Sequence, residues 1–321
     1  MTTLKVEPIR EDLGFGARVG GVTRDACSDD AVRAQIKDLF ERYGLLVFTD
    51  VEPTPSMQVA VSTVIGPLKD HPSKATPRAG GELGVIEIRH LPNVGGRVRL
   101  NGEELSQWLP WHFDHCYNDE LNRAGVLRAV EIPLEGGRTG FVDGIALYRA
   151  LSPELRNRIE DATILYAMDV ILDNLHFGRP ADFVEVEASP EAAAVMTEFA
   201  DRPRALHPAV WTRETGEKVL HVSPWMAKGI DGREGGEGDA LLAAVCDEIC
   251  DAARELSYFH VWQPTDMVVW DNLRVLHSVS GMAPSAGRCM HRTTIKGDYG
   301  LGRFETADET AAAGGVGRAM R

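Results

Sequence analysis

Short apolar runs separated by turns rich in glycine and proline recur along most of the chain, with longer segments of helical periodicity between them. Continuous apolar runs of four to eight residues are typical of buried strands, whereas a spacing of three to four residues predicts amphipathic helices. We expect strands near 45–48, 85–88, 111–115, 124–130, 219–222, 267–270 and 288–295 and one that begins at 207, and helices at 29–43, 55–65, 153–161 and 239–255 and one that begins at 189. The pattern therefore predicts a mainly β fold with flanking helices.

Two segments interrupt this pattern. Residues 72–107 are rich in glycine and proline, which predicts a mobile active-site lid around one short strand. Residues 170–206 are polar and helix-prone, and we expect them to form a helical insertion beside the substrate pocket. The remaining pattern predicts a single domain over residues 1–303, and the Ala/Gly-rich tail at 304–321 lacks core-forming residues and is expected to be disordered.

Charge and cysteine usage narrow the classes of function. A net charge of −14 over 321 residues argues against nucleic acid and against an anionic membrane surface as partners. No apolar run reaches transmembrane length, and the N-terminus does not resemble a signal peptide. The cysteines are scattered without zinc-ribbon spacing, at Cys27, Cys116, Cys246, Cys250 and Cys289. We therefore expect a cytoplasmic protein that acts on a small molecule.

The strongest chemical signal is the sequence Trp111-His112-Phe113-Asp114. In a strand, side chains two residues apart share a face, so His112 and Asp114 would point the same way. Together they form two thirds of a 2-His-1-carboxylate triad, a common set of ligands for non-heme Fe(II). A His-x-Asp match alone is usually chance, and the hypothesis therefore depends on a third ligand. His277, at the end of a late apolar run, is the candidate.

Two arginines follow His277 on a predicted strand. Arg288 and Arg292 share a face by the strand period of two and would lie roughly 13 Å apart. Arginine is the side chain best suited to bidentate capture of carboxylates. Two arginines on one face near a metal site indicate an anionic cosubstrate and an anionic substrate.

These motifs together resemble the taurine dioxygenase and chlorophenoxyacetate dioxygenase family of Fe(II)/2-oxoglutarate-dependent oxygenases. The resemblance runs from about residue 8 to about residue 300. The matching motifs are Trp111-His112-Phe113-Asp114, Gly136-Gly137-Arg138-Thr139, Trp270-Asp271-Asn272, His277 and Arg288. Phe113 and Arg138 depart from the family pattern, and Arg138 would add charge near the site. The resemblance implies a double-stranded β-helix, also called a jelly-roll or cupin-like core, with the metal site at one mouth.

The resemblance also implies roles for single residues. His112, Asp114 and His277 would bind Fe(II). Arg288, with Thr139, would hold the distal carboxylate of 2-oxoglutarate, and O₂ would bind the remaining position. Arg292 would orient an anionic substrate, and His71, Lys74 and Trp108 are candidates for lining its pocket.

The identity of one pocket residue suggests the substrate class. Trp108 stands where taurine-specific members carry asparagine, so we expect a carboxylate with an aromatic or alkyl body, larger and more apolar than taurine. The expected reaction is hydroxylation of a C–H bond with release of succinate and CO₂. Cleavage of a sulfonate after hydroxylation is the alternative. Family members are often dimers or tetramers, and we expect a homo-oligomer here too.

Three other classes fit part of the pattern. A zinc hydrolase also uses two histidines and a carboxylate, but it would not require the paired arginines or the Gly-Gly-x-Thr motif. A non-enzymatic 2-oxoglutarate sensor would retain the arginines, although it would have no need for a complete ligand set. An interaction protein on a β-sandwich would have no reason to direct two arginines toward a metal.

Overall fold

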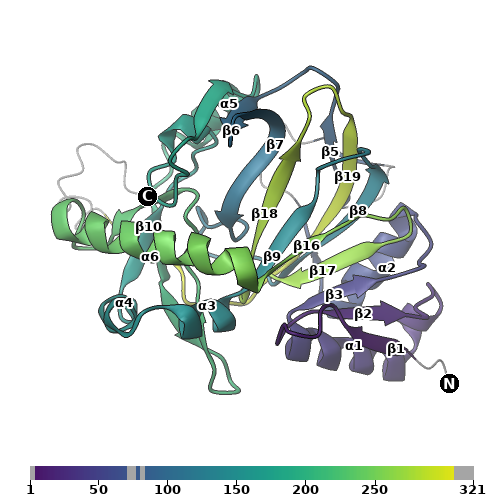
Figure 1. Cartoon of the computed structure of the whole chain (residues 1–321). Helices are drawn as coiled ribbons and strands as arrows, with labels where there is room; N and C mark the ends of the chain where they lie inside the picture. The colour runs from purple at the N-terminus through teal and green to yellow at the C-terminus, as the bar shows by residue number, and fades with distance from the viewer. Residues whose placement is uncertain (1–3, 71–76, 80–83, 307–321) are drawn as a thin grey trace.

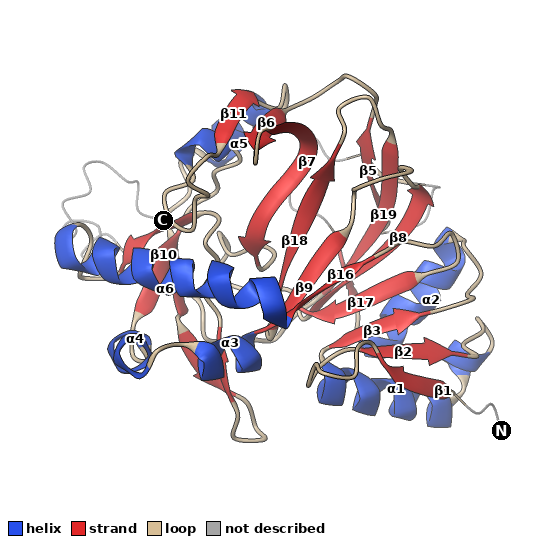
Figure 2. Cartoon of the chain, viewed as in Figure 1, coloured by secondary structure: helices blue, strands red, loops and turns tan. Residues whose placement is uncertain are grey.

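The computed structural model describes residues 4–70, 77–79 and 84–306 of the chain. Within these residues two large β-sheets face each other and carry most of the core, with helices on the outside (Figure 1). Strands predominate over helices, as the hydrophobic pattern predicts, and Figure 2 shows the two sheets in red with the helices in blue around them.

The larger sheet contains the buried strands predicted from continuous apolar runs. Its order is β1 (Lys5–Pro8), β2 (Ala17–Gly20), β3 (Leu45–Phe48), β17 (Met267–Asp271), β8 (Ala124–Glu131), β19 (Arg288–Ile295) and β4 (Leu68–Lys69), and β5 (Ile86–His90) also pairs with β19. β2 and β3 are parallel, and the other pairs in this sheet are antiparallel. Both faces of β3 and β17 are covered, which explains why these strands are apolar throughout.

Two N-terminal helices cover the outer face of the larger sheet. α1 (Asp30–Tyr43) begins where the Asp29 carboxylate accepts hydrogen bonds from two backbone N–H groups, and it ends at Gly44, whose φ is 68°. α2 (Pro55–Ile65) begins after Thr54, whose hydroxyl caps the helix, with proline in the first turn. The apolar sides of both helices pack on β3, β8 and β17. Both helices agree with the sequence prediction.

The smaller sheet holds the strands that position the candidate site. Its order is β11 (Val184–Glu187), β6 (Arg97–Leu100), β7 (Glu103–His112), β18 (Val275–Met282), β9 (Thr139–Asp143) and β16 (Ser257–His260). The space between the two large sheets is filled by apolar side chains from both, including Leu127, Phe141, Val268, Trp270, Val275 and Met290. The sheets are thus held together by a shared hydrophobic core.

The segment 72–107, expected to be a mobile lid, contains β5, β6 and the start of β7 among its described residues. Asn101 and Gly102 have φ values of 52° and 80° and connect β6 to β7 as a tight hairpin. Positive φ at both central residues is the signature of the two-residue hairpin turn that Asn-Gly favours. Residues 84–107 therefore contain more regular structure than the one short strand expected there, and a lid at 72–107 stays a prediction.

The remaining elements form a third layer at one end of the sandwich. They comprise the sheets β15 (Ala227–Ile230), β10 (Thr163–Tyr166), β12 (Ala205–Pro208), β20 (Arg303–Phe304) and β13 (Val210–Thr212) with β14 (Lys218–Leu220), and the helices α3 (Gly144–Ala150), α4 (Pro153–Ile159), α5 (Ala192–Phe199) and α6 (Gly236–Leu256). Residues 170–206 contain the 3₁₀ turn Leu172–Asn174, β11 and α5, so this insertion is mixed rather than helical. β11 extends the smaller sheet at its edge.

The ordered chain continues past the expected domain end at residue 303. β20 pairs with β12, and the carboxylate of Glu305 forms a buried ion pair with Arg204. Arg204 also binds Glu234, so the C-terminal segment is tied to the turn before α6. The rest of the tail, at 307–321, lies outside the described residues.

Candidate metal centre and active-site cavity

Three side chains predicted as metal ligands lie together at one end of the sandwich. His112 is the last residue of β7 and faces His277 of β18 directly in the strand register. Their ring centroids are 4.0 Å apart, and Nε2 of His277 lies 3.6 Å from Oδ2 of Asp114. One donor atom from each of the three residues lies within 4.8 Å of the others, and all three residues are buried. This spacing is compact enough for one metal ion.

The protonation states of the three side chains suit a metal. Nδ1 of His112 donates a hydrogen bond to the carbonyl oxygen of Pro110 at 2.8 Å, which leaves Nε2 with its lone pair free. Burial lowers the pKa of His112 and holds that of His277 well below its ordinary value, so both rings are neutral. Burial alone would raise the pKa of Asp114, but the positive charge of Arg292 brings it below its usual range. Two neutral imidazoles and one ionised carboxylate fit Fe(II).

Arg292 contacts the candidate ligand set directly. Its Nη2 donates to Oδ2 of Asp114 at 2.5 Å, and its guanidinium lies over the Trp270 ring at 5.6 Å from the centroid. The Trp270 ring also packs on His277, with 5.0 Å between centroids. Trp270 therefore supports one candidate ligand and the arginine that pairs with another.

Arg288 is a buried cation that forms no ion pair with any residue the structure describes. It is 4% exposed, and its Nε and Nη2 have no hydrogen-bond partner among the described residues. Burial lowers the pKa of Arg288 to about 10. A buried, unpaired guanidinium is costly, so an anionic ligand at this point would relieve a real penalty.

The Gly136-Gly137 turn brings the chain close to Arg288. Gly137 has φ of 61°, and a Cβ there would lie 2.7 Å from Cγ of Pro133 and 3.4 Å from Cδ of Arg288. Glycine is therefore required for both the conformation and the approach. Thr139 follows in β9, is buried, and its hydroxyl accepts a hydrogen bond from Nε1 of Trp262 at 3.3 Å. The Thr139 hydroxyl keeps its own proton available for donation.

A cavity of about 490 Å³, here called the triad cavity, opens beside these residues. His112, Asp114 and Arg292 supply its polar corner. The rest of the wall is largely apolar and includes Ile88, Leu109, Tyr117, Met168, Val170, Val195, Phe199, Trp225 and Met226. Glu87, Arg89 and Glu191 also line the cavity. A largely apolar cavity with a few polar groups is the usual form of a small-molecule site. The sequence analysis missed this wall, because its residues come from separate elements without a shared motif.

Trp108, another predicted substrate residue, does not line the triad cavity. Trp108 lines an adjoining cavity of about 360 Å³, here called the side cavity, and packs on Phe183 with 5.1 Å between ring centroids. The two cavities share wall residues such as Leu109 and Trp225. His71 and Lys74 lie outside the described residues.

The two departures from the family pattern have different surroundings. Arg138 has an exposed side chain, and its backbone N–H donates to the hydroxyl of Ser280 at 3.1 Å. The expectation that Arg138 adds charge near the site stays a prediction. The Phe113 ring stacks on His221, with 3.8 Å between ring centroids, and so points into the packed third layer.

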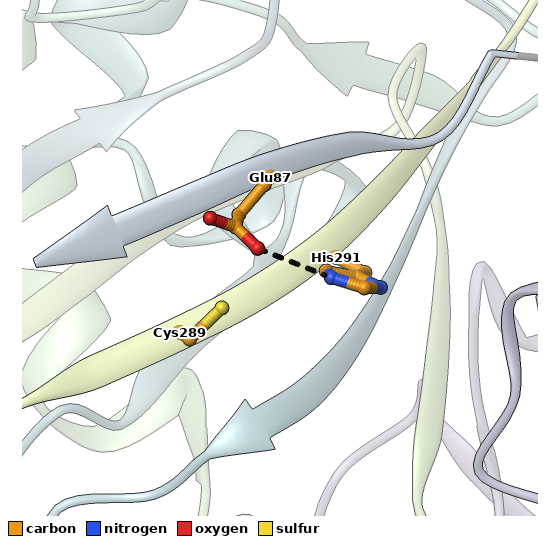
Figure 3. A group of neighbouring side chains, drawn as sticks. All are labelled: Glu87, Cys289 and His291. Atoms are coloured by element: carbon orange, nitrogen blue, oxygen red, sulfur yellow. Dashed lines mark ion pairs between the residues drawn. The ribbon is translucent and has the colours of Figure 1, made fainter. Parts of the chain in front are cut away.

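A second group of possible ligands, Glu87, Cys289 and His291, lies on β5 and β19 (Figure 3). Its hydrogen bonds argue against a metal. Arg128 donates to Nδ1 of His291 at 2.8 Å, so the proton of the neutral ring is on Nε2, which faces Glu87 at 3.6 Å. Arg89 also donates to both oxygens of Glu87. The group is already satisfied as a network of charges and hydrogen bonds that joins the two strands.

Comparisons with known proteins agree with this geometry. The sequence model of the family described as "Taurine catabolism dioxygenase TauD, TfdA family" matches residues 5–294. The chain is 30% identical over 308 residues to the (S)-phenoxypropionate/alpha-ketoglutarate-dioxygenase of Sphingobium herbicidovorans, covering 94% of this chain and 96% of that protein. It is 28% identical over 284 residues to the alpha-ketoglutarate-dependent 2,4-dichlorophenoxyacetate dioxygenase of Cupriavidus pinatubonensis, covering 86% and 92%.

A solved structure shares the fold. The crystal structure of AAD-2 in complex with Mn(II) and N-oxalylglycine superposes with a TM-score of 0.69 at 22% identity, covering 93% of this chain and 99% of that one. The jelly-roll core predicted from the sequence is thereby confirmed. Among the described residues, no helix is both long and apolar enough to cross a bilayer.

Proposed function

The chain belongs to the taurine catabolism dioxygenase family, and we propose that it hydroxylates a C–H bond of a small carboxylate with an apolar or aromatic body. Members of this family are oxygenases that use Fe(II), 2-oxoglutarate and O₂, which confirms the predicted enzyme class and cofactors. In the proposed reaction one oxygen atom enters the substrate and the other enters succinate, with release of CO₂. Bound Fe(II) and 2-oxoglutarate would supply the oxidising chemistry, and the protein supplies binding, orientation and exclusion of water.

The observation that carries the proposal is the buried group of His112, Asp114 and His277. Two neutral imidazoles and one ionised carboxylate, converging from one side, leave other coordination positions open. A zinc hydrolase would share this group, but it gives no role to a second, unpaired cation such as Arg288. We therefore propose these three residues as the Fe(II) ligands.

Arg288 and Thr139 are the proposed partners of the distal carboxylate of 2-oxoglutarate. Within the described part of the chain the buried guanidinium of Arg288 has no counterion, and Thr139 has a hydroxyl proton to donate. A carboxylate bound here would satisfy the arginine and remove the penalty of its burial. The cosubstrate would thus be bound where the protein alone leaves a charge unpaired.

Arg292 is the proposed partner of the substrate carboxylate. It supplies positive charge to the polar corner of the triad cavity, next to Asp114. A guanidinium carries five N–H donors, and the bond to Asp114 uses one of them. The apolar wall around Met168, Phe199 and Met226 suits an aromatic or alkyl body better than a small polar one. Trp108 would be reached by a substrate that extends into the side cavity.

Binding at the metal is tested first. The purified protein is mixed with Fe(II) and 2-oxoglutarate without oxygen, and the weak visible charge-transfer band of the chelate is recorded. Wild type should show the band, and His277→Ala should not. Absence of the band in wild type would refute the assignment of the metal site.

Substrate class is tested next. After O₂ is admitted, succinate release is measured with aryl and alkyl carboxylates and with sulfonates of matched body. Release stimulated by carboxylates supports the proposal. Preference for sulfonates favours the sulfonate-cleaving alternative, and binding without turnover across the whole panel favours a 2-oxoglutarate sensor.

A further inference from the structure

The side chain of Asn272 forms hydrogen bonds with both the backbone N–H and the backbone carbonyl group of Asp114, a proposed iron ligand. It lies between β17 and β18 and is fully buried, with 0% exposure. Its Oδ1 accepts a hydrogen bond from the backbone N–H of Asp114 at 2.8 Å. Its Nδ2 donates to the carbonyl oxygens of Asp114 at 3.1 Å and of Asn122 at 3.2 Å. The polar atoms of this side chain are thus all occupied by the chain around Asp114.

Asp114 needs such support because it lies beyond the end of a strand. His112 is still in β7, where pairing with His277 fixes its position. Asp114 follows in a turn, and the next residue, His115, has φ of 60°. Sheet hydrogen bonds therefore do not fix the Asp114 backbone. The Asn272 amide takes the place of a neighbouring strand at this residue.

Asn272 is itself supported from behind. Nε2 of His221 donates to the backbone carbonyl oxygen of Asn272 at 2.9 Å. The His221 ring stacks on Phe113, the residue between the proposed ligands His112 and Asp114, with ring planes 16° apart. Burial lowers the pKa of His221 to about 3, so the ring is neutral and keeps the proton that it donates. The unusual Phe113 thus packs against the group that supports Asp114.

We propose that Asn272 is a positioning residue for the metal centre, which holds the Asp114 carboxylate at the metal while His221 and Phe113 hold Asn272. This inference rests on the proposed function, because the position of Asp114 matters only if that carboxylate binds Fe(II). Partners that orient metal ligands typically change metal affinity or activity by about 10- to 100-fold when they are removed. A purely structural amide would instead change stability alone.

The test compares two buried amides of the same kind. Asn272→Leu replaces the amide with an apolar side chain of similar shape and so removes its hydrogen bonds to the Asp114 backbone. The matched control is Gln58→Met, because Gln58 is also fully buried and its Nε2 donates to the carbonyl oxygens of Val126 and His291. For each variant, the dissociation constant of Fe(II) is measured without oxygen, and thermal unfolding is recorded for the metal-free protein.

We expect both variants to lose stability, but only Asn272→Leu to bind Fe(II) roughly 10- to 100-fold more weakly. Fe(II) affinity within twofold of wild type in Asn272→Leu would overturn the proposal. If Asn272→Leu does not fold, Fe(II) affinity is measured in His221→Phe instead. This variant keeps the ring stack on Phe113 but loses the hydrogen bond to Asn272. A loss of affinity of roughly 2- to 10-fold supports the proposal, and no loss overturns it.

A failure of the metal assignment would look different. Wild type would then bind Fe(II) no more tightly than His277→Ala, whatever the behaviour of the Asn272 variant. Tight binding by wild type, lost in His277→Ala but kept in Asn272→Leu, would refute only the positioning role.

Discussion

Replacing Arg288 with methionine separates two effects of one buried charge. In the unliganded protein the guanidinium is 4% exposed and has no carboxylate partner among the described residues. Lowering its pKa from 12.5 to about 10 corresponds to about 3 kcal/mol against the charged form. Arg288→Met should therefore raise the free energy of unfolding of the unliganded protein by up to about 3 kcal/mol, less the packing lost with the longer side chain.

The pH dependence of this penalty has a defined sign. Between about pH 10 and 12.5 the unfolded chain binds a proton that the folded chain has released, so stability rises with pH there. Below about pH 10 both states are protonated and the penalty is fully present. An assay at pH 8 therefore measures the whole effect.

The same substitution should weaken cosubstrate binding. Truncating one partner of a buried, hydrogen-bonded charge pair costs about 2–4 kcal/mol, which is roughly a 30- to 900-fold rise in KM for 2-oxoglutarate. Unfolding in urea and initial rates of succinate release at varied 2-oxoglutarate measure the two effects separately. The expected outcome is a protein that is as stable as wild type or more so, yet is a poor user of its cosubstrate.

Arg274 provides the control. It is also buried, but two of its nitrogens donate to both carboxylate oxygens of Asp143, at 2.8 and 3.0 Å. Arg274→Met should cost about 3–5 kcal/mol of stability, because it leaves Asp143 buried and unpaired, and KM should not change. An unchanged KM in Arg288→Met, or a loss of stability on the scale of Arg274→Met, would refute the reasoning.

Three further predictions follow from the fold. A chain that ends after residue 303 lacks Glu305 and leaves Arg204 partly unpaired, so urea unfolding should show a loss of about 2–3 kcal/mol relative to a chain that ends at 306. Gly102→Ala should cost about 1 kcal/mol with unchanged kcat, because φ is 80° there but nothing lies within 4 Å of the added Cβ. Burial lowers the pKa of His207 to about 4 and of His221 to about 3, so the unfolded chain binds more protons than the folded chain below pH 6.5. As the pH falls from 6 to 4, each histidine should therefore remove about 1.4 kcal/mol of stability per pH unit. A urea midpoint that does not fall from pH 7 to 5 would contradict this.

The candidate ligands could be found from the sequence, although one reason was incomplete. His112 and His277 lie on paired strands, as the apolar runs around them indicate. Asp114 was expected to share a face with His112 by strand alternation, yet β7 ends at His112. The contacts that place Asp114 come from Asn272, 158 residues away in the chain. A local pattern cannot reveal a hydrogen bond of this range.

The hairpin between β6 and β7 had a local signal in the sequence that was not used. The segment 72–107 was interpreted as a lid because it is rich in glycine and proline. Asn101-Gly102 lies between two runs with alternating apolar residues, and this arrangement is the strongest short-range indication of a hairpin. The turn dipeptide was more informative here than the composition of the whole segment.

The wall of the triad cavity could not have been predicted in the same way. Met168, Phe199 and Met226 come from a loop, a helix and another loop, and each is an ordinary apolar residue in sequence. Trp108 was assigned to the pocket because it stands where taurine-specific members carry asparagine, but in the structure it lines the side cavity. Which cavity a side chain reaches depends on the packing of several elements together.

Arg292 shows why Arg288 is the better residue for testing the anion sites. Because Arg292 donates to Asp114, it takes part in both the ligand set and the proposed substrate corner. Removing it would leave the Asp114 carboxylate with a higher pKa and a freer position, so a loss of activity could arise at the metal or at the substrate. Arg288 contacts no proposed ligand, so a change in KM for 2-oxoglutarate in Arg288→Met, with Fe(II) affinity unchanged, reports on the cosubstrate alone. Fe(II) affinity measured in Arg292→Met would in turn show how much of the Arg292 effect passes through Asp114.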